Sequence, residues 1–341
     1  MSLKDRFNNL FPDAEFLELQ QGDWIQLLYK NGWIKPSDKV VALEKPGEGN
    51  MNFLLRIRTE AGSFIVKQSR PWVEKYPQIE APSERIFVEA AFYNALKRNT
   101  FFDKFVPSII GFDAKNMILA MEDLGEASDF TFIYKTGSSL SASDTSSLIE
   151  FISHLHNSAS TTEPFPDNAA LKKLNHIHIF EYPYSRNNGF DLNVIQHGLQ
   201  ELSYKYKDNE SLKEIVKGLG ELYLGKGNTL VHGDYYPGSW LKTRSGVKII
   251  DPEFSHYGYP EFDIGVMTAH LLMSRISMSQ ARAMMEAYRI PEGFDDSLSA
   301  QFCGAEIIRR VIGLAQLPLD LTLQEKSILL DRAEQMIRMG E

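Results

Sequence analysis

The sequence has few of the features that mark secreted, membrane or nucleic-acid-binding proteins. Its single cysteine, Cys303, excludes an internal disulfide and a cysteine-rich zinc site. No apolar run approaches the roughly 18 to 20 residues that span a bilayer, and the first residues lack the apolar stretch of a secretory signal. The net charge is -9 and no dense run of Lys and Arg occurs. We therefore expect a cytoplasmic protein with no membrane or nucleic-acid partner. Its oligomeric state stays open, with a homodimer as one candidate.

The 341 residues suffice for two domains, and their character changes along the chain. Runs typical of β-strands occupy 40–59 and 63–68, and Ser83 is a candidate N-cap for the helix that follows. After Asp123 the pattern is mostly helical, apart from a strand–loop–strand segment at 229–254. The sequence predicts an α+β protein of two lobes, a small β-rich lobe at 1–122 and a larger helical lobe at 123–341.

Three carboxylates follow two short apolar runs of that strand–loop–strand segment. Asp234 ends the triplet His-Gly-Asp, and Asp251 and Glu253 frame a proline. Phosphoryl transfer uses one carboxylate to orient the attacking hydroxyl and others to hold Mg2+ against the phosphates. We therefore interpret Asp234 as the catalytic residue and Asp251 and Glu253 as metal ligands. Each short motif alone is also typical of an ordinary turn.

Several residues of the first lobe are suited to binding ATP. Glycines between two strands let a hairpin lie close over phosphates. A lysine in an apolar strand needs a partner, which we expect to be Glu89 on the next helix, and the pair would present an ammonium group to the phosphates. The end of the first lobe is the candidate hinge. The predicted nucleotide-binding residues are Gly47, Gly49, Asn50, Lys67, Glu89, Met121, Glu122, Asp123 and Leu124.

This order of parts resembles that of protein kinases, and the His-Gly-Asp triplet is similar to that of the aminoglycoside phosphotransferase and choline kinase superfamily. Within it, HGDYYPGSWL, IIDPEFSHYGYPEFDIG, VKQSRPWV, MEDL and RRVIGLAQ resemble methylthioribose kinases. The resemblance implies a protein-kinase-like fold and ATP- and Mg2+-dependent transfer to a sugar-like acceptor, 5-methylthioribose. It also implies that Asp251 and Glu253 both serve the metal, that Ser239 replaces a common asparagine, and that Arg309 and Arg310 contact the sugar.

Alternatives concern the acceptor and the existence of activity. Residues 235–237 and 259–261 depart from the methylthioribose kinase pattern, so an aminoglycoside, an amino alcohol or another sugar stays open as acceptor. A nucleotide-binding pseudokinase scaffold is disfavoured because all the expected charged groups are present. Other residues have a structural reading beside a functional one: Asp263 is expected to cap a helix or anchor the catalytic loop, and Tyr235 and Trp240 to line the acceptor pocket or pack.

Overall fold

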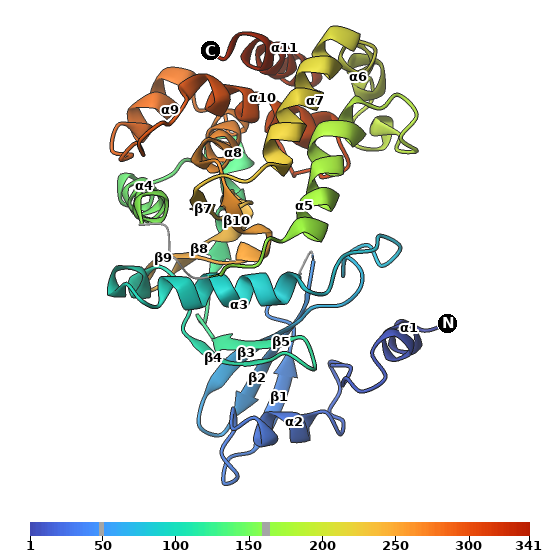
Figure 1. Ribbon diagram of the computed structural model, residues 1–341, viewed down its shortest axis with the longest axis vertical. Helices are drawn as coiled ribbons and strands as arrows, with labels where there is room; N and C mark the ends of the chain where they lie inside the picture. The colour runs from blue at the N-terminus through green and yellow to red at the C-terminus, as the bar shows by residue number, and fades with distance from the viewer. Residues whose placement is uncertain (48–50, 159–163) are drawn as a thin grey trace. The chain divides into compact units, whose positions relative to one another are not determined.

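A computed structural model describes residues 1–47, 51–158 and 164–341. The chain forms two compact units: unit 1 is Met1–Ala127 with Lys248–Glu253, and unit 2 is Ser128–Val247 with Phe254–Glu341. The α+β class is confirmed, because unit 1 contains a small antiparallel sheet and unit 2 is mainly helical (Figure 1). Asp251 and Glu253 belong to unit 1, although the sequence-based boundary had assigned them to the second lobe.

Unit 1 is built on a five-stranded sheet of order β1-β2-β3-β5-β4. Every neighbouring pair is antiparallel, and β1, β2 and β3 form a meander over the residues where strands were predicted. Its elements are β1 (Val40–Glu44), β2 (Phe53–Thr59), β3 (Ser63–Gln68), β4 (Ile109–Asp113), β5 (Ile118–Glu122), α1 (Leu3–Leu10), α2 (Ile25–Lys30), α3 (Arg85–Leu96) and the 3-10 helix η1 (Thr100–Lys104).

Strand β3 is covered on both of its faces. Leu55 and Ile57 of β2 and Val66 of β3 join Trp24 and Leu28 in one apolar cluster. Because side chains of a strand alternate between faces, the residues on either side of Val66 point away from this cluster. Nearly all of β3 is nevertheless buried, so its second face is covered as well. A polar side chain on that face must find partners inside the protein.

The start of α3 differs from the prediction. Ser83 was the expected N-cap, but the helix begins at Arg85 after Glu84, and no side chain caps it. Instead, the buried guanidinium group of Arg85 donates to the backbone carbonyls of Pro82, Arg70, Met51 and Trp72. Contacts with distant backbone thus fix this helix end and outweigh the local capping preference of serine.

Unit 2 contains eight α-helices among its described residues, with short strands and helical turns between them. The strands β7 and β10 pair antiparallel, and a second small sheet has the order β6-β8-β9. The elements are α4 (Ala142–Asn157), α5 (Ala169–His176), α6 (Leu199–Lys207), α7 (Glu210–Leu224), α8 (Pro260–Met273), α9 (Met278–Met285), α10 (Asp296–Ile312), α11 (Leu323–Met339), β6 (Ser128–Asp129), β7 (Thr229–Val231), β8 (Trp240–Thr243), β10 (His256–Gly258), the π-helix η3 (Ile177–Glu181) and the 3-10 helices η2 (Phe130–Tyr134), η4 (Tyr182–Tyr184), η5 (Leu192–Val194) and η6 (Pro237–Ser239). Strand β9 (Gly246–Ile249) and the 3-10 helix η7 (Pro252–Phe254) each have residues in both units.

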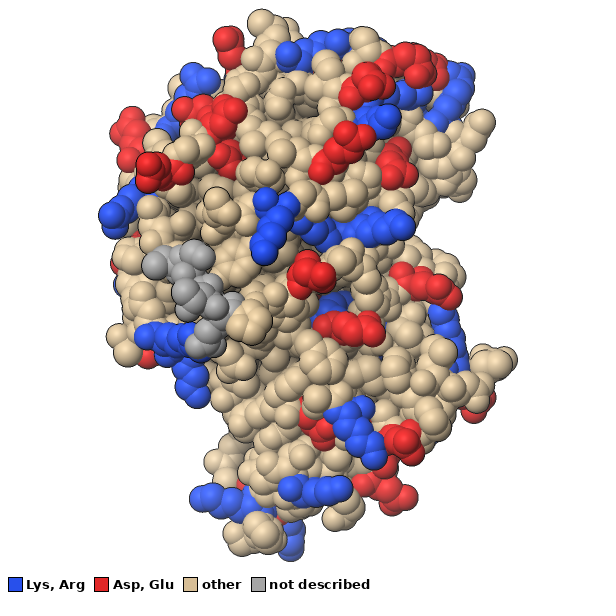
Figure 2. Space-filling view, viewed as in Figure 1, with Lys and Arg blue, Asp and Glu red and all other residues tan. Residues whose placement is uncertain are grey.

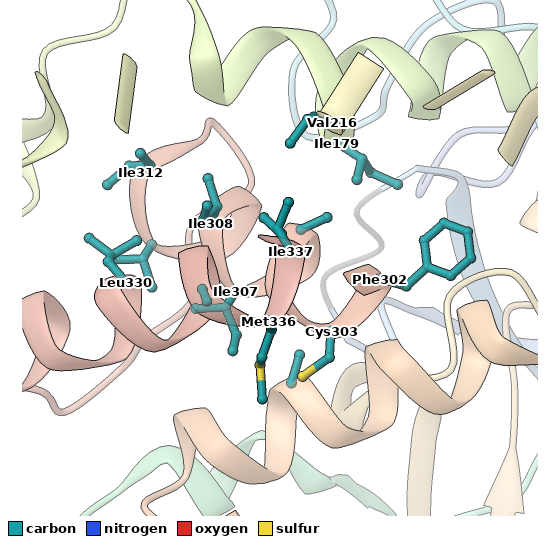
Figure 3. Close-up of a cluster of buried hydrophobic side chains, with 14 of the residues drawn as sticks. Ile179, Val216, Phe302, Cys303, Ile307, Ile308, Ile312, Leu330, Met336 and Ile337 are labelled. Atoms are coloured by element: carbon teal, nitrogen blue, oxygen red, sulfur yellow. The ribbon is translucent and has the colours of Figure 1, made fainter. Parts of the chain in front are cut away.

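Helix α10 runs through the core of unit 2 and packs against α8 and α11. Its Ile307 and Ile308 lie in the apolar cluster of Figure 3, with Leu330 and Ile337 of α11. A Cβ atom at Gly304 would lie 2.5 Å from a backbone oxygen of α11, so the two helices approach closely only because this residue is glycine. Close packing on two sides holds α10 firmly, and with it the polar side chains that the helix carries.

Charged residues are distributed without a large area of one sign on the face shown in Figure 2, where Lys and Arg lie among Asp and Glu. Within the described ranges, no helix is both long and apolar enough to cross a membrane.

One buried lysine of unit 2 is expected to reduce stability. Lys207 ends α6, is fully buried, and its amine has no hydrogen-bond partner among the described residues. Burial lowers the pKa of this amine, because the charged form is poorly solvated there. We expect Lys207→Met to raise the free energy of unfolding at pH 7 by about 1–3 kcal/mol, since it removes an uncompensated polar group.

The sign of the pH dependence follows from the lowered pKa of Lys207. Between that pKa and the ordinary value near 10.4, the unfolded chain binds more protons than the folded chain, so the wild-type protein gains stability as pH rises. The advantage of Lys207→Met should therefore shrink towards pH 10. Urea unfolding at several pH values measures this, with Lys205→Met, at a surface ion pair with Asp331, as control. A less stable Lys207→Met variant would contradict the prediction.

Candidate active site

A buried lysine is the centre of a charged cluster in unit 1. Lys67 lies on the face of β3 opposite to Val66, and its side chain is 3% exposed. Its Nζ donates to both carboxylate oxygens of Glu89 on α3 at 2.8 Å, and it also binds Oδ1 of Asp251. The expected Lys67–Glu89 pair is therefore present, and the structure adds Asp251 to it.

The charges of this cluster do not balance around Lys67 alone. Burial would lower the pKa of Lys67, but the carboxylates of Asp251, Glu89 and Glu253 raise it, so the amine is charged. Burial raises the pKa of Glu89 to about 7; Asp251 and Glu253 add to this effect, and Lys67 opposes it. Three carboxylates share the Lys67 ammonium group, and Arg85 lies next to Glu253 alone among them, so a further cation near Asp251 would relieve the repulsion that remains.

Glu253 is held deeper inside unit 1 than Asp251. Its Oε2 accepts a hydrogen bond from Asn52 Nδ2 at 2.8 Å and lies 3.2 Å from Arg85 Nε. Asn52 in turn accepts from Arg85 Nε at 2.9 Å. Burial raises the pKa of Glu253, although Lys67 and Arg85 oppose this. Neither Asn52 nor Arg85 was identified from the sequence, because no local motif links them to Glu253.

Asp251 has an uncommon backbone conformation. Its φ of 60° lies in the left-handed region, which aspartate tolerates better than most residues with a side chain. Two residues earlier, Ile249 N–H donates to the Phe105 carbonyl at 2.7 Å and fixes the approach to it. The Asp251 side chain is 42% exposed, so its carboxylate contacts Lys67 and is still open to solvent. Such locally strained residues cluster at functional sites.

The unit 1 acids do not enclose a metal by themselves. Across 1–47, 51–158 and 164–341 no group of three or more His, Cys, Asp or Glu side chains is placed to hold an ion. Asp251 and Glu253 supply two carboxylates, and other ligands would have to come from a bound molecule or water.

The structure describes the other predicted nucleotide-binding residues only in part. Gly47 lies in an exposed bend after β1, and Gly49 and Asn50 lie outside the described residues. Met121 and Glu122 end β5, and Leu124 is half-buried beyond it.

Asp123 is engaged within unit 1. Its carboxylate accepts from Ser63 Oγ at 2.6 Å and from Gly125 N–H at 3.0 Å, and it pairs with Arg56 Nε at 2.8 Å. Burial would raise its pKa, but the hydrogen bonds from Ser63 and Arg56 lower it. This carboxylate therefore braces the end of β5.

In unit 2, Asp263 anchors the loop that carries Asp234. The carboxylate of Asp263 accepts from the backbone N–H groups of His232 at 2.7 Å and Gly233 at 2.9 Å, and lies 3.1 Å from His156 Nε2. Burial would raise its pKa, but the His156 hydrogen bond and neighbouring groups lower it. The expectation that Asp263 anchors this loop is confirmed, and the N-cap position of α8 is occupied by Tyr259.

The loop also requires glycine at position 233. Gly233 has a φ of +82°, and an added Cβ would lie 2.3 Å from the Phe254 carbonyl oxygen. Ser239 Oγ donates to the Asp234 carbonyl at 2.8 Å, so this side chain supports the loop backbone. Tyr235 and Trp240 are both fully buried, and Tyr235 donates to the Leu148 carbonyl, so the packing interpretation of these two aromatics applies.

One residue of the predicted arginine pair, Arg310, lies beside Asp234. Arg310 NH2 is 3.3 Å from Asp234 Oδ1, and Arg310 Nε is 2.5 Å from Glu306 Oε1. Arg309 NH1 is 3.1 Å from Glu306 Oε2, and its NH2 donates to Asn175 Oδ1 at 3.2 Å. Burial would lower the pKa of Arg310, but Glu306 and Asp234 raise it, so the group stays charged. The structure thus brings Arg310 together with Asp234, and Glu306 joins Arg310 to Arg309.

Two further buried residues continue this arrangement. His270 Nε2 lies 3.1 Å from Glu306 Oε1, and Tyr134 Oη lies 2.5 Å from His270 Nδ1. The ring of Tyr236 lies 4.7 Å from the guanidinium carbon of Arg310. Sequence reasoning missed all of these residues. Glu306 had a signal, because it stands three and four positions before the two arginines, at the spacing of helical ion pairs.

The sequence is similar to those of known phosphotransferases. Residues 43–297 match the phosphotransferase enzyme family APH. A methylthioribose kinase of Exiguobacterium sibiricum is 29% identical over an alignment of 353 positions that covers 88% of this chain and 87% of the relative. A methylthioribose kinase of Pectobacterium atrosepticum is 25% identical, with coverage of 93% and 91%.

Among solved structures, the spectinomycin phosphotransferase APH(9)-Ia in complex with ADP and spectinomycin aligns with a TM-score of 0.53 at 12% identity, over 95% of this chain and 99% of that one. The similarity confirms the predicted protein-kinase-like fold. Because the family match extends over more than half of the sequence, the chain belongs to the APH phosphotransferase family and is an ATP-dependent small-molecule kinase.

Proposed function

We propose that this enzyme transfers the γ-phosphate of ATP to a hydroxyl group of 5-methylthioribose. The observation that carries the proposal is the buried guanidinium group of Arg310, whose NH2 lies 3.3 Å from Asp234 Oδ1 and which shares Glu306 with Arg309. Guanidinium N–H groups suit the hydroxyl oxygens of a sugar, and their charge disfavours a polycationic acceptor. The methylthioribose kinases that are 25% and 29% identical to the chain support the same acceptor.

In this proposal Asp234 is the catalytic residue. Its carboxylate orients the acceptor hydroxyl and takes its proton while the hydroxyl oxygen forms a bond to the γ-phosphorus. The bond between that phosphorus and the oxygen bridging to the β-phosphate breaks, and ADP leaves. Arg309 and Arg310 bind the acceptor and keep it next to the carboxylate.

Asp251 and Glu253 are the proposed ligands of Mg2+. Their hard carboxylate oxygens suit this ion, which commonly takes one or two carboxylates and completes its shell with phosphate oxygens and water. Asp251 and Glu253 supply two carboxylates, which is a number that Mg2+ commonly takes from a protein. The exposed carboxylate of Asp251 and the crowding of negative charge around Lys67 fit a Mg2+ site as well. The ion would neutralise charge on the phosphates during transfer.

The remaining unit 1 residues are proposed to bind ATP. Lys67, fixed by Glu89, presents its ammonium group to the phosphates. The loop with Gly47, Gly49 and Asn50 covers the phosphates, and the segment from Met121 to Leu124 meets the base.

Lys67→Ala is expected to raise the KM for ATP by about 10-fold or more, because a buried ammonium group directed at phosphates is lost. Glu89→Gln should raise it less, since Lys67 keeps its charge and its contact with Asp251. Steady-state kinetics with varied ATP measures both effects, and Lys97→Ala, at the end of α3, is the control. An unchanged KM for ATP in both variants would make Lys67 a structural residue only.

A panel of acceptors tests the proposed substrate. ADP release is measured with 5-methylthioribose, other pentoses, choline, ethanolamine and aminoglycosides, at saturating ATP and Mg2+. We expect kcat/KM to be highest for 5-methylthioribose and lowest for the polycations. Aminoglycosides that outperform every sugar would refute the sugar acceptor. ADP release with none of the acceptors would favour a nucleotide-binding scaffold.

The proposal places the reaction in the cytoplasm and includes a homodimer as the assembly to test. Sedimentation of the purified protein at several concentrations distinguishes a monomer from a dimer.

A further inference from the structure

Within unit 2, a continuous chain of buried polar side chains begins at Asp234. It runs from Asp234 to Arg310, then to Glu306, His270 and Tyr134, and every step is a contact of 3.3 Å or less. Of these, Glu306 is 1% exposed and His270 is 0% exposed, so solvent plays little part in their contacts. We call the three residues Tyr134, His270 and Glu306 the supporting array.

The hydrogen bonds fix the protonation of the array. Burial raises the pKa of Tyr134, so its hydroxyl keeps the proton and donates to His270 Nδ1. Burial also lowers the pKa of His270 to about 4, so at neutral pH the ring has one proton, which must be on Nε2. That proton faces Glu306 Oε1. The reverse assignment would set a nitrogen lone pair against a carboxylate, which is repulsive.

Glu306 is the residue at which the array meets both arginines. Burial would raise its pKa, but Arg310, Arg309 and the His270 hydrogen bond hold that pKa well below its usual range. Oε1 is shared by Arg310 and His270, and Oε2 binds Arg309. The orientation of a single carboxylate therefore sets the positions of two guanidinium groups.

An array of this kind is a poor way to gain stability. The attraction within a buried ion pair is largely cancelled by the cost of removing both charges from water. A protein with apolar residues of similar size in place of the pair is often just as stable. The surrounding part of α10 is otherwise apolar, with Ile307, Ile308, Val311 and Ile312 in the core. The Nε of Arg309 is buried without a hydrogen-bond partner among the described residues, which adds to the cost. The desolvation cost of these side chains is explained if they hold reacting groups in position.

We propose that Tyr134, His270 and Glu306 are positioning residues that hold Arg310 against Asp234 and Arg309 against Asn175. Their contribution is to keep Asp234 directed at the acceptor hydroxyl. The inference rests on the proposed role of Asp234 in transfer. It predicts that loosening the array lowers kcat and lets water compete with the acceptor, so that some ADP is released without phosphorylated acceptor.

The test compares variants that loosen the array to different degrees. Tyr134→Phe removes only the hydroxyl, and His270→Leu removes the donor to Glu306. We expect kcat with 5-methylthioribose to fall by about 10-fold and about 100-fold, in the range typical when supporting hydrogen bonds of a site are lost. The KM for ATP should stay within about twofold, because the ATP-binding residues belong to unit 1. His270→Gln, which retains an N–H donor, should be less impaired than His270→Leu.

Three measurements separate positioning from a purely structural role. They are kcat, the ratio of phosphorylated acceptor to ADP released, and the melting temperature. The control is Tyr206→Phe, which removes a hydroxyl bonded to Asp331 from another fully buried tyrosine of unit 2. The proposal is supported if array variants lose kcat and coupling while Tyr206→Phe loses neither.

Array variants with wild-type kcat and coupling would overturn the proposal, whether or not their melting temperature falls. The same conclusion would follow if His270→Gln and His270→Leu were equally impaired while still folded. Failure of the proposed substrate is a different result, because it would appear in the wild-type enzyme. In that case the comparison is made with the best acceptor of the panel.

Discussion

Asp234→Asn is expected to lower kcat by about 10²- to 10⁴-fold, the usual contribution of a well-placed general base. Asparagine keeps the shape of the side chain and an oxygen that can accept from Arg310 NH2, which lies 3.3 Å from Oδ1 in the wild type. It cannot take the proton of an acceptor hydroxyl. The remaining activity is measured as phosphorylated acceptor formed in reactions that are stopped after minutes to hours.

The affinity for ATP should be nearly unchanged in Asp234→Asn, because the residues proposed to bind ATP belong to unit 1. Equilibrium binding of a fluorescent ATP analogue checks this. The matched control is Asp331→Asn, an aspartate of unit 2 that pairs with Lys205 and Tyr206 away from the loop. If Asp234→Asn turned over at a rate near that of the control, Asp234 would not be the catalytic residue.

Asp251→Ala is expected to lower kcat by about 100-fold or more at 1 mM Mg2+, since a metal that neutralises phosphate charge contributes several kcal/mol to transfer. Of the two acids, Asp251 is the one with a solvent-exposed carboxylate, and its loss also removes a partner of Lys67. Activity should recover in part at high Mg2+, because the phosphates still bind the ion. A titration of activity against Mg2+ gives the concentration for half-maximal rate.

Glu253→Gln should shift the same titration less, because Glu253 is nearly enclosed by Asn52 and Arg85. Asp103→Ala, at an exposed acid of unit 1, should leave the curve unchanged. Identical Mg2+ curves for Asp251→Ala, Glu253→Gln and the control would remove both acids from the metal site.

What could be predicted depended on whether a local pattern carried the information. The Lys67–Glu89 pair followed from an amine in an apolar strand and an acid on the next helix. The hydrogen bonds between Asp263 and the loop of Asp234 correspond to one of the two roles that were expected for this acid. Even Glu306 could have been paired with the arginines, since helical spacing alone brings them together.

The contacts that were missed join residues far apart in sequence. Tyr134 and His270 are 136 positions apart, and Asn52 and Glu253 are 201 apart, so only the folded chain brings them together. The N-cap at Ser83 was wrong for a related reason. Arg85 makes buried contacts with backbone from distant segments, and these outweigh the single hydrogen bond that a serine cap would add.

The short segment Lys248–Glu253 belongs to unit 1, although the chain on both sides of it belongs to unit 2. A gene fragment that ends at Ala127 would therefore encode the sheet, Lys67 and Glu89, but neither Asp251 nor Glu253. Unit 1, which is the proposed nucleotide-binding part, is therefore not encoded by one uninterrupted stretch of DNA. A designer who wishes to exchange unit 1 between relatives must transplant two separate pieces, because an exchange at a single junction after Ala127 would pair Lys67 of one protein with the acids at positions 251 and 253 of another.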